Sequence, residues 1–124
     1  KAVGHSNGGL VLTGLLESGF LEKKKLTVRK LAIIGSPYQF NQEMYNDFQT
    51  RKHRLEKEVE ILNFVGNFAG TSDGIVPLSS AQAAQSIFEK QAYTEVNLKG
   101  RKAHHSALPT NPDLVKQLSL FLNL

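Results

Sequence analysis

The feature that most constrains the fold is a series of short apolar runs separated by helix-like segments. Residues 31–34, Leu-Ala-Ile-Ile, are a continuous apolar run, which is typical of a parallel strand buried on both faces. Residues 59–68 form a further β-rich run, and residues 93–98 alternate apolar and polar side chains, as strands do. This alternation predicts an α/β fold with three layers, α/β/α, in which a parallel sheet is connected by right-handed crossover helices.

Local signals set the expected limits of each element. Gly19 is a typical helix end, Ser79 is available as an N-cap, and Asn111-Pro112 is a typical helix start. The expected strands are residues 1–4, 28–35, 59–68 and 93–98, and the expected helices are residues 7–17, 41–57, 79–90 and 112–122. In the last helix we expect one apolar side, formed by Leu114, Val115, Leu118 and Phe121.

Composition narrows the class of protein. A chain of 124 residues has room for one domain. The chain has no cysteine, which excludes disulfides, thiolate nucleophiles and cysteine metal sites. The net charge is +4, but acidic residues are mixed with the basic ones, so a solvated surface is expected and no nucleic-acid partner. No apolar window is long enough for a transmembrane segment, and histidines and carboxylates do not cluster in a way that implies a metal or another cofactor.

The sequence Gly4-His5-Ser6-Asn7-Gly8 lies between the first strand and the first helix. A serine hydroxyl needs an exposed, fixed position and a neighbouring base to become a nucleophile. The G-x-S-x-G turn supplies that position, because Gly4 and Gly8 let the strand and the helix approach closely. The pattern therefore predicts Ser6 as a nucleophile, with Gly9 giving further room for helix packing.

The same glycines are compatible with a phosphate-binding loop at a helix N-terminus. However, the chain lacks the G-K-[ST] of a P-loop. A dinucleotide site would need an acidic residue near the end of the next strand, where the chain has Gly35-Ser36-Pro37. A structural role is the other alternative, since glycine-rich turns open many helices.

A serine nucleophile requires an acid and then a histidine, each in a loop after a later strand. Asp73 is the only carboxylate in residues 70–77, and His104 and His105 both lie in residues 100–110. Asp73-Gly74 could instead form a simple turn, and either histidine could be a solvated loop residue. The order serine, acid, histidine, each after its own strand, favours a catalytic site.

Together, "VGHSNGGL", "GTSDGIVPLSSA" and "HHSALPTNPDL" resemble the C-terminal half of α/β-hydrolases. The chain is most similar to bacterial serine hydrolases described as cell-surface or lipase-like. The resemblance covers nearly the whole chain and implies that His105, which directly precedes Ser106, is the catalytic histidine and that Asp73 is the acid. One departure is Asn7, where many relatives have methionine; its side chain is not needed for the chemistry.

The mechanism that follows is acyl transfer through a Ser6-Asp73-His105 triad and an acyl-enzyme. The backbone N–H of Asn7 would supply one oxyanion donor, and in this fold the second comes from a loop after an earlier strand. No earlier strand precedes residues 1–4. We therefore expect residues 1–124 to be the C-terminal part of a single hydrolase domain whose N-terminal half is a missing partner, and expect the chain alone to be weak or inactive.

Residues 38–58 lie where α/β-hydrolases insert caps, so only a short cap is expected. Phe40, Met44 and Tyr45, together with Phe48, could line an acyl site, or they could be the core-facing residues of an ordinary crossover helix. The expected substrate is a small-molecule ester or lipid-like compound, and thioesters and peptides or amides stay open. The alternative function is a catalytically inactive hydrolase-fold fragment that acts in binding or assembly.

Overall fold

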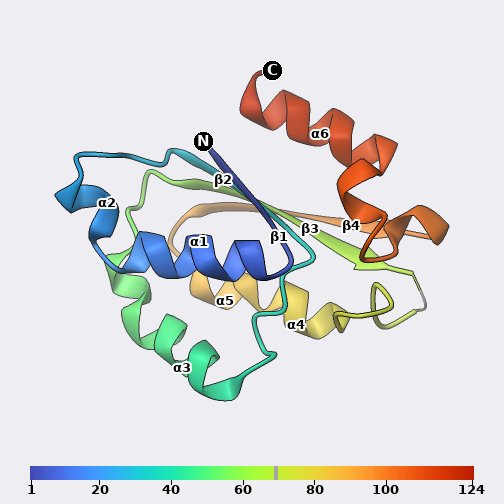
Figure 1. Cartoon of the computed structure of the whole chain (residues 1–124), viewed down its shortest axis with the longest axis horizontal. Helices are drawn as coiled ribbons and strands as arrows, with labels where there is room; N and C mark the ends of the chain where they lie inside the picture. Colours follow the sequence, from blue (N-terminus) through green and yellow to red (C-terminus); the bar gives the residue numbers. More distant parts are fainter. Residues whose placement is uncertain (69) are drawn as a thin grey trace.

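A computed structural model describes residues 1–68 and 70–124. Its centre is a parallel sheet with the strand order β1-β2-β3-β4, shown in Figure 1. The strands are β1 (Ala2–His5), β2 (Lys30–Ile34), β3 (Glu60–Asn67) and β4 (Ala92–Lys99). Each pairs in parallel with the next strand along the chain. The predicted α/β fold with a parallel sheet is confirmed.

Helices cover both faces of the sheet, as Figure 1 shows. One face packs against α1 (Asn7–Glu17), α3 (Gln42–Arg51) and α5 (Ala84–Ile87), and the other packs against α6 (Pro112–Leu122). Three shorter elements lie on the connections: α2 (Phe20–Lys23), α4 (Leu78–Gln82) and η1 (Lys52–Arg54). The 3₁₀ turns η2 (Arg101–Ala103) and η3 (Leu108–Thr110) flank the histidine loop.

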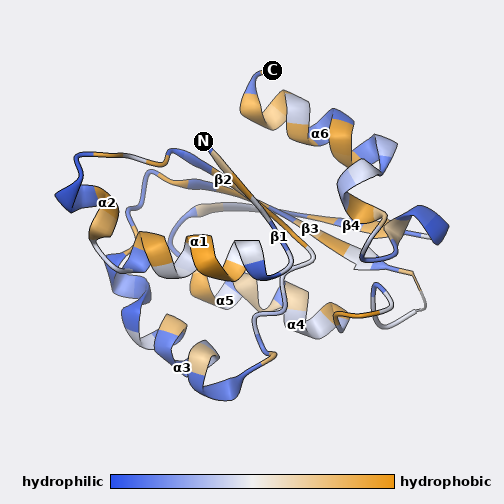
Figure 2. Cartoon of the chain, viewed as in Figure 1, coloured by the Kyte–Doolittle hydropathy of each residue, from blue (hydrophilic) through white to orange (hydrophobic). Residues whose placement is uncertain are grey.

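The apolar run in β2 explains why the sheet is buried on both sides. Leu31 and Ile33 join the core beneath α1 and α3, whereas Ala32 and Ile34 join the core beneath α6. All four are buried. Figure 2 shows the same distribution, with hydrophobic residues along the strands and α1 and hydrophilic residues over much of α3. A strand that is apolar at consecutive positions can satisfy both cores only in this central layer.

Several expected elements differ in detail. The limits of α1 match the prediction, and Asn111 caps α6 by accepting hydrogen bonds from two backbone N–H groups. The expected helix over residues 79–90 is instead two short helices separated at Ala83, and Ser79 is not its N-cap. The helix expected over residues 41–57 ends at Arg51 and is followed by the 3₁₀ turn η1. The short helix α2 was not predicted.

The apolar side of α6 also needs one correction. Leu114, Leu118 and Phe121 pack into the core against β2 and β3, but Val115 is 46% exposed. The reason is geometric, because adjacent residues on a helix point about 100° apart. Among residues 1–68 and 70–124, no helix is long and apolar enough to cross a membrane.

Candidate active site

The serine of the glycine-rich turn has an unusual backbone conformation. Ser6 lies between β1 and α1 with φ 56° and ψ −124°, a positive φ that non-glycine residues rarely adopt. Its backbone N–H donates to the Ile34 carbonyl at 2.8 Å, which fastens the turn to the end of β2. Strain of this kind, of order 1–3 kcal/mol, is typically found at functional sites.

The glycines around Ser6 differ in how much space they have. A Cβ on Gly4 would lie 2.6 Å from the carbonyl carbon of Gly8 and the nitrogen of Gly9, so only glycine fits there. A Cβ on Gly9 would lie 2.0 Å from Ser36 Oγ. A Cβ on Gly8 would meet nothing within 4 Å. The expected need for a small residue therefore holds at Gly4 but falls on Gly9 rather than Gly8. The reason is that a Cβ on Gly9 would point toward Ile33 and Ser36, whereas a Cβ on Gly8 would point into open space.

The acid, the histidine and the serine form one hydrogen-bonded series. His105 Nε2 lies 3.0 Å from Ser6 Oγ, and His105 Nδ1 lies 2.7 Å from Asp73 Oδ2. Asp73 is 1% exposed and His105 is 8% exposed. An ionised carboxylate only accepts hydrogen bonds, so the tautomer of His105 that fits both contacts has its proton on Nδ1 and a free Nε2 facing the serine hydroxyl. This is the geometry required of a base that activates a hydroxyl.

Asp73 both makes the local turn and orients the histidine. Its Oδ1 accepts from the backbone N–H groups of Ile75 at 2.9 Å and Val76 at 2.6 Å, leaving Oδ2 for His105. The backbone N–H of His105 donates to the Asp73 carbonyl at 2.8 Å. The turn expected at Asp73 and a hydrogen bond from Asp73 to His105 are thus both present in the structure, and the two alternatives for Asp73 do not exclude each other.

His104 points away from this series. Its Nδ1 lies 3.0 Å from Ser106 Oγ, and its ring stands edge-on to Phe68 with 5.0 Å between ring centroids. The residues alone left the choice between His104 and His105 open. The structure brings only His105 to Ser6 and Asp73.

Two glycines that the sequence analysis did not single out make room for the acid and the histidine. A Cβ on Gly35 would lie 3.2 Å from Asp73 Oδ2 and 3.3 Å from His105 Nδ1. In β3, a Cβ on Gly66 would lie 2.5 Å from the Ala103 carbonyl oxygen. A glycine inside a strand commonly marks such a close approach. The position of Gly66 inside an expected strand could therefore have indicated that another segment packs against it.

The residues expected to line an acyl site separate into two groups. Phe40 and Met44 line a hollow of about 510 Å³ together with Asn7, the residue that follows Ser6. Phe40 is 82% exposed. Tyr45 does not line this hollow, because its position on α3 turns it toward α5, where its hydroxyl lies 2.7 Å from Ser86 Oγ. Phe48, 7% exposed, belongs to the core.

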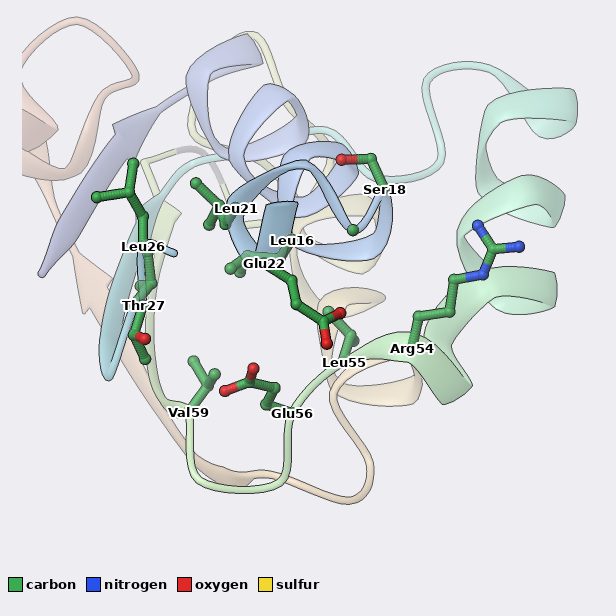
Figure 3. A pocket seen from close by; sticks show the side chains of 12 residues that line it. Leu16, Ser18, Leu21, Glu22, Leu26, Thr27, Arg54, Leu55, Glu56 and Val59 are labelled. Carbon is green, nitrogen blue, oxygen red and sulfur yellow. The ribbon is translucent and has the colours of Figure 1, made fainter. Parts of the chain in front are cut away.

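Another hollow, of about 440 Å³, lies at the opposite end of the sheet. Figure 3 shows its wall, which includes Leu16 from α1, Glu22 from α2 and Val59 just before β3. Since β3 starts here and Ser6 follows the end of β1, this hollow is remote from the serine. Within the two described segments, no group of three or more histidine, aspartate or glutamate side chains is arranged to hold a metal ion.

The fold is that of an α/β-hydrolase. The chain belongs to a family described as alpha/beta hydrolases of unknown function (DUF915), whose model matches residues 1–123. No match was found among curated proteins.

Two solved structures are similar to the chain. The product of gene lin2722 from Listeria innocua has 30% identity and a TM-score of 0.85, over 97% of this chain and 56% of that one. A "putative cell surface hydrolase" from Lactobacillus plantarum WCFS1 has 30% identity and a TM-score of 0.81, over 97% of this chain and 52% of that one. The chain thus spans about half the length of these structures.

Proposed function

We propose that the chain carries the catalytic residues of a serine hydrolase that cleaves carboxylic esters through an acyl-enzyme. The observation that carries the proposal is the continuous series from Asp73 through His105 to Ser6, with 2.7 Å and 3.0 Å between the bonded atoms. Loops without a shared function would not be expected to place an acid, a base and a strained serine at successive hydrogen-bond distances. Membership of a hydrolase family supports the same reading.

In the first half-reaction, Ser6 Oγ attacks the carbonyl carbon of the ester while His105 Nε2 takes the hydroxyl proton. The carbonyl oxygen becomes an oxyanion, and Asp73 stabilises the imidazolium that has formed. The oxyanion collapses, the bond to the alcohol oxygen breaks, and His105 gives its proton to the departing alcohol. Water, activated by the neutral His105, then attacks the acyl-enzyme, and the carboxylic acid leaves as Ser6 regains its proton.

The oxyanion needs hydrogen-bond donors. Asn7 is the first residue of α1, and the first N–H groups of a helix have no partner within the helix. Its backbone N–H follows Ser6 directly, and the positive end of the helix dipole favours a developing negative charge there. We assign it as one oxyanion donor.

The second oxyanion donor is proposed to come from an N-terminal half of the same domain. Two observations support this partner. The similar structures are nearly twice as long as the residues that match them. In addition, β1 is an edge strand, and Val3 within it is 44% exposed, whereas long apolar edges are usually covered.

The hollow beside Asn7 supports a proposal for the substrate class. Its apolar lining comes from α1, from Phe40 before α3 and from Met44 within α3, and its polar lining includes the carboxylates of Glu43 and Asp47. An open hollow that combines apolar side chains with two carboxylates favours the uncharged chain of an ester or lipid-like molecule over an anionic substrate. We propose Phe40 and Met44, and not Tyr45, as lining residues.

The test is labelling of the full-length gene product with a fluorophosphonate, read by intact-mass spectrometry. We expect one adduct, located on Ser6, and none in Ser6→Ala. The 124-residue chain measured in parallel should label more slowly, because the proposed second oxyanion donor comes from the N-terminal half. A folded full-length protein that takes no adduct, or that takes it on another residue, would contradict the proposal and favour a binding role.

A further inference from the structure

His5, the residue before the nucleophile, contacts the candidate base. Its Nε2 lies 3.0 Å from the backbone carbonyl oxygen of His105. The two imidazole rings also pack together, with 4.7 Å between centroids and 34° between planes. The second position of a G-x-S-x-G turn is unrestricted in the motif, so the sequence alone gave His5 no role.

The hydrogen bond fixes the protonation of one ring nitrogen. A backbone carbonyl can only accept, so His5 Nε2 must be the donor and must carry a proton. In neutral His5 this leaves Nδ1 unprotonated. Nε2 of His5 is therefore committed to a structural contact and is unavailable as a base for a serine hydroxyl.

The contact connects the histidine loop to the strand that carries the nucleophile. His105 is otherwise attached to Asp73 twice, through its backbone N–H at 2.8 Å and its ring at 2.7 Å. Those two bonds orient the imidazole of His105, but they do not fix the distance between the imidazole and Ser6. Without a further contact, that distance depends on how the loop packs. His5 and Ser6 are adjacent in the chain, so a bond from His5 to the His105 backbone sets that distance directly.

We propose that His5 is a positioning residue that keeps the imidazole of His105 within reach of Ser6. The inference rests on the proposed hydrolase function. The serine and the base must meet at hydrogen-bond distance before the proton moves, and a displacement of about 1 Å can cost about 100-fold in rate. His5 is not among the residues that line the hollow beside Asn7, so its loss should lower the acylation rate and leave substrate binding nearly unchanged.

Two substitutions separate the donor from the ring. His5→Gln retains an N–H that can reach the His105 carbonyl but removes the ring contact. His5→Phe retains a ring but removes the donor. In the full-length gene product, we expect His5→Phe to lower kcat for a p-nitrophenyl ester by about 10- to 100-fold with KM unchanged, and His5→Gln to recover most of the loss.

A matched control is His53→Phe, because His53 is an exposed histidine in η1; it should behave as wild type. Circular dichroism and the Tm verify that each variant is folded, and His5→Leu replaces His5→Phe if the latter does not fold. A folded variant without the donor that keeps the wild-type kcat would overturn the proposal. So would equal losses in His5→Gln and His5→Phe, which would indicate a packing role only.

A readout independent of activity distinguishes this inference from the proposed function. Nitrogen-15 NMR of the imidazole rings at alkaline pH should find His5 protonated at Nε2 and unprotonated at Nδ1. The opposite tautomer would refute the positioning bond even in an active enzyme. If the expected tautomer is found in a protein that no phosphonate labels, the bond stands and the hydrolase proposal alone fails.

Discussion

The two ends of the sheet are built differently. At the carboxyl end, Ser6 has a positive φ, and a Cβ on Gly4 or Gly35 would press against neighbouring atoms within 3.3 Å. At the amino end, the connections surround an open hollow of about 440 Å³, and a Cβ on Gly19 would meet nothing within 4 Å. Close contact is concentrated where the candidate chemistry is, whereas positive φ values occur at both ends, at Ser6 and at Lys25.

The difference indicates which properties each end controls. Close contacts at the carboxyl end fix the distances among three side chains, so small changes there should alter activity. Open space at the amino end tolerates added atoms, so changes there should alter the free energy of unfolding at most. This is the usual separation in α/β proteins, where sites gather at the carboxyl ends of the strands. Matched substitutions at the two ends can test it.

The largest expected effect is the contrast between two neighbouring histidines. His105→Ala removes the group bonded to both Ser6 and Asp73 and should lower kcat by at least about 10⁴-fold. His104→Ala removes a side chain bonded to Ser106 and should change kcat by no more than about twofold. Ester hydrolysis by the full-length gene product measures both. Comparable losses in the two variants would contradict the assignment of His105.

The next effect concerns two glycines of the turn around Ser6. Gly4→Ala places a Cβ 2.6 Å from backbone atoms that cannot move aside, and should lower the free energy of unfolding by about 3 kcal/mol or more. Gly8→Ala has free space, and alanine favours a helix, so stability should be unchanged or higher by up to about 1 kcal/mol. Urea unfolding compares them. A stable Gly4→Ala protein would show that the turn is looser than described.

A smaller effect separates strain from contact. Gly35 has φ 56° and Gly19 has φ 76°, so alanine at either position should cost about 1–2 kcal/mol of stability. Only at Gly35 does the added Cβ reach Asp73 and His105. We expect Gly35→Ala to lower kcat by about 10- to 100-fold and Gly19→Ala to leave it unchanged. Equal kcat values in the two variants would contradict the claim that only the carboxyl end of the sheet controls activity.

These residues also show what the sequence could and could not provide. The turn at Ser6 and the limits of α1 were predictable, because glycine spacing and helix signals are local. The choice of His105 over His104 depended on family resemblance, since the bonded pairs Asp73–His105 and Ser6–His105 are 32 and 99 residues apart.

Positions that depend on packing between distant segments were missed. Gly35 must be small only because the loops that carry Asp73 and His105 pack against it. His5 has a proposed role only because its ring reaches the His105 backbone. The orientation of Tyr45 could not be predicted from the sequence pattern either. Adjacent helical residues point about 100° apart, and the sequence does not show whether Met44 or Tyr45 faces the site. Local propensity cannot encode these contacts, which the complete fold creates.

The last prediction tests the amino end, where α1 finishes with a buried glutamate. Glu17 is 1% exposed, and its Oε2 has no hydrogen-bond partner among residues 1–68 and 70–124. Burial raises the pKa of Glu17 from 4.5 to about 7, with Arg51 and Arg54 opposing the rise. The folded protein thus holds this proton more tightly than the unfolded chain, so the free energy of unfolding falls as pH rises from about 4.5 to 7.

Glu17→Gln removes that loss, because glutamine has no charge to bury. Urea unfolding should find the variant more stable than wild type by about 1–3 kcal/mol at pH 8, with the difference vanishing near pH 4. The exposed Glu22→Gln is the control and should match wild type at both pH values. Ester hydrolysis at neutral pH should be unchanged in Glu17→Gln. A variant less stable than wild type at pH 8 would mean that the ionised carboxylate is stabilised by Arg51 and Arg54, and that the amino end depends on charge pairing rather than on tolerance of open space.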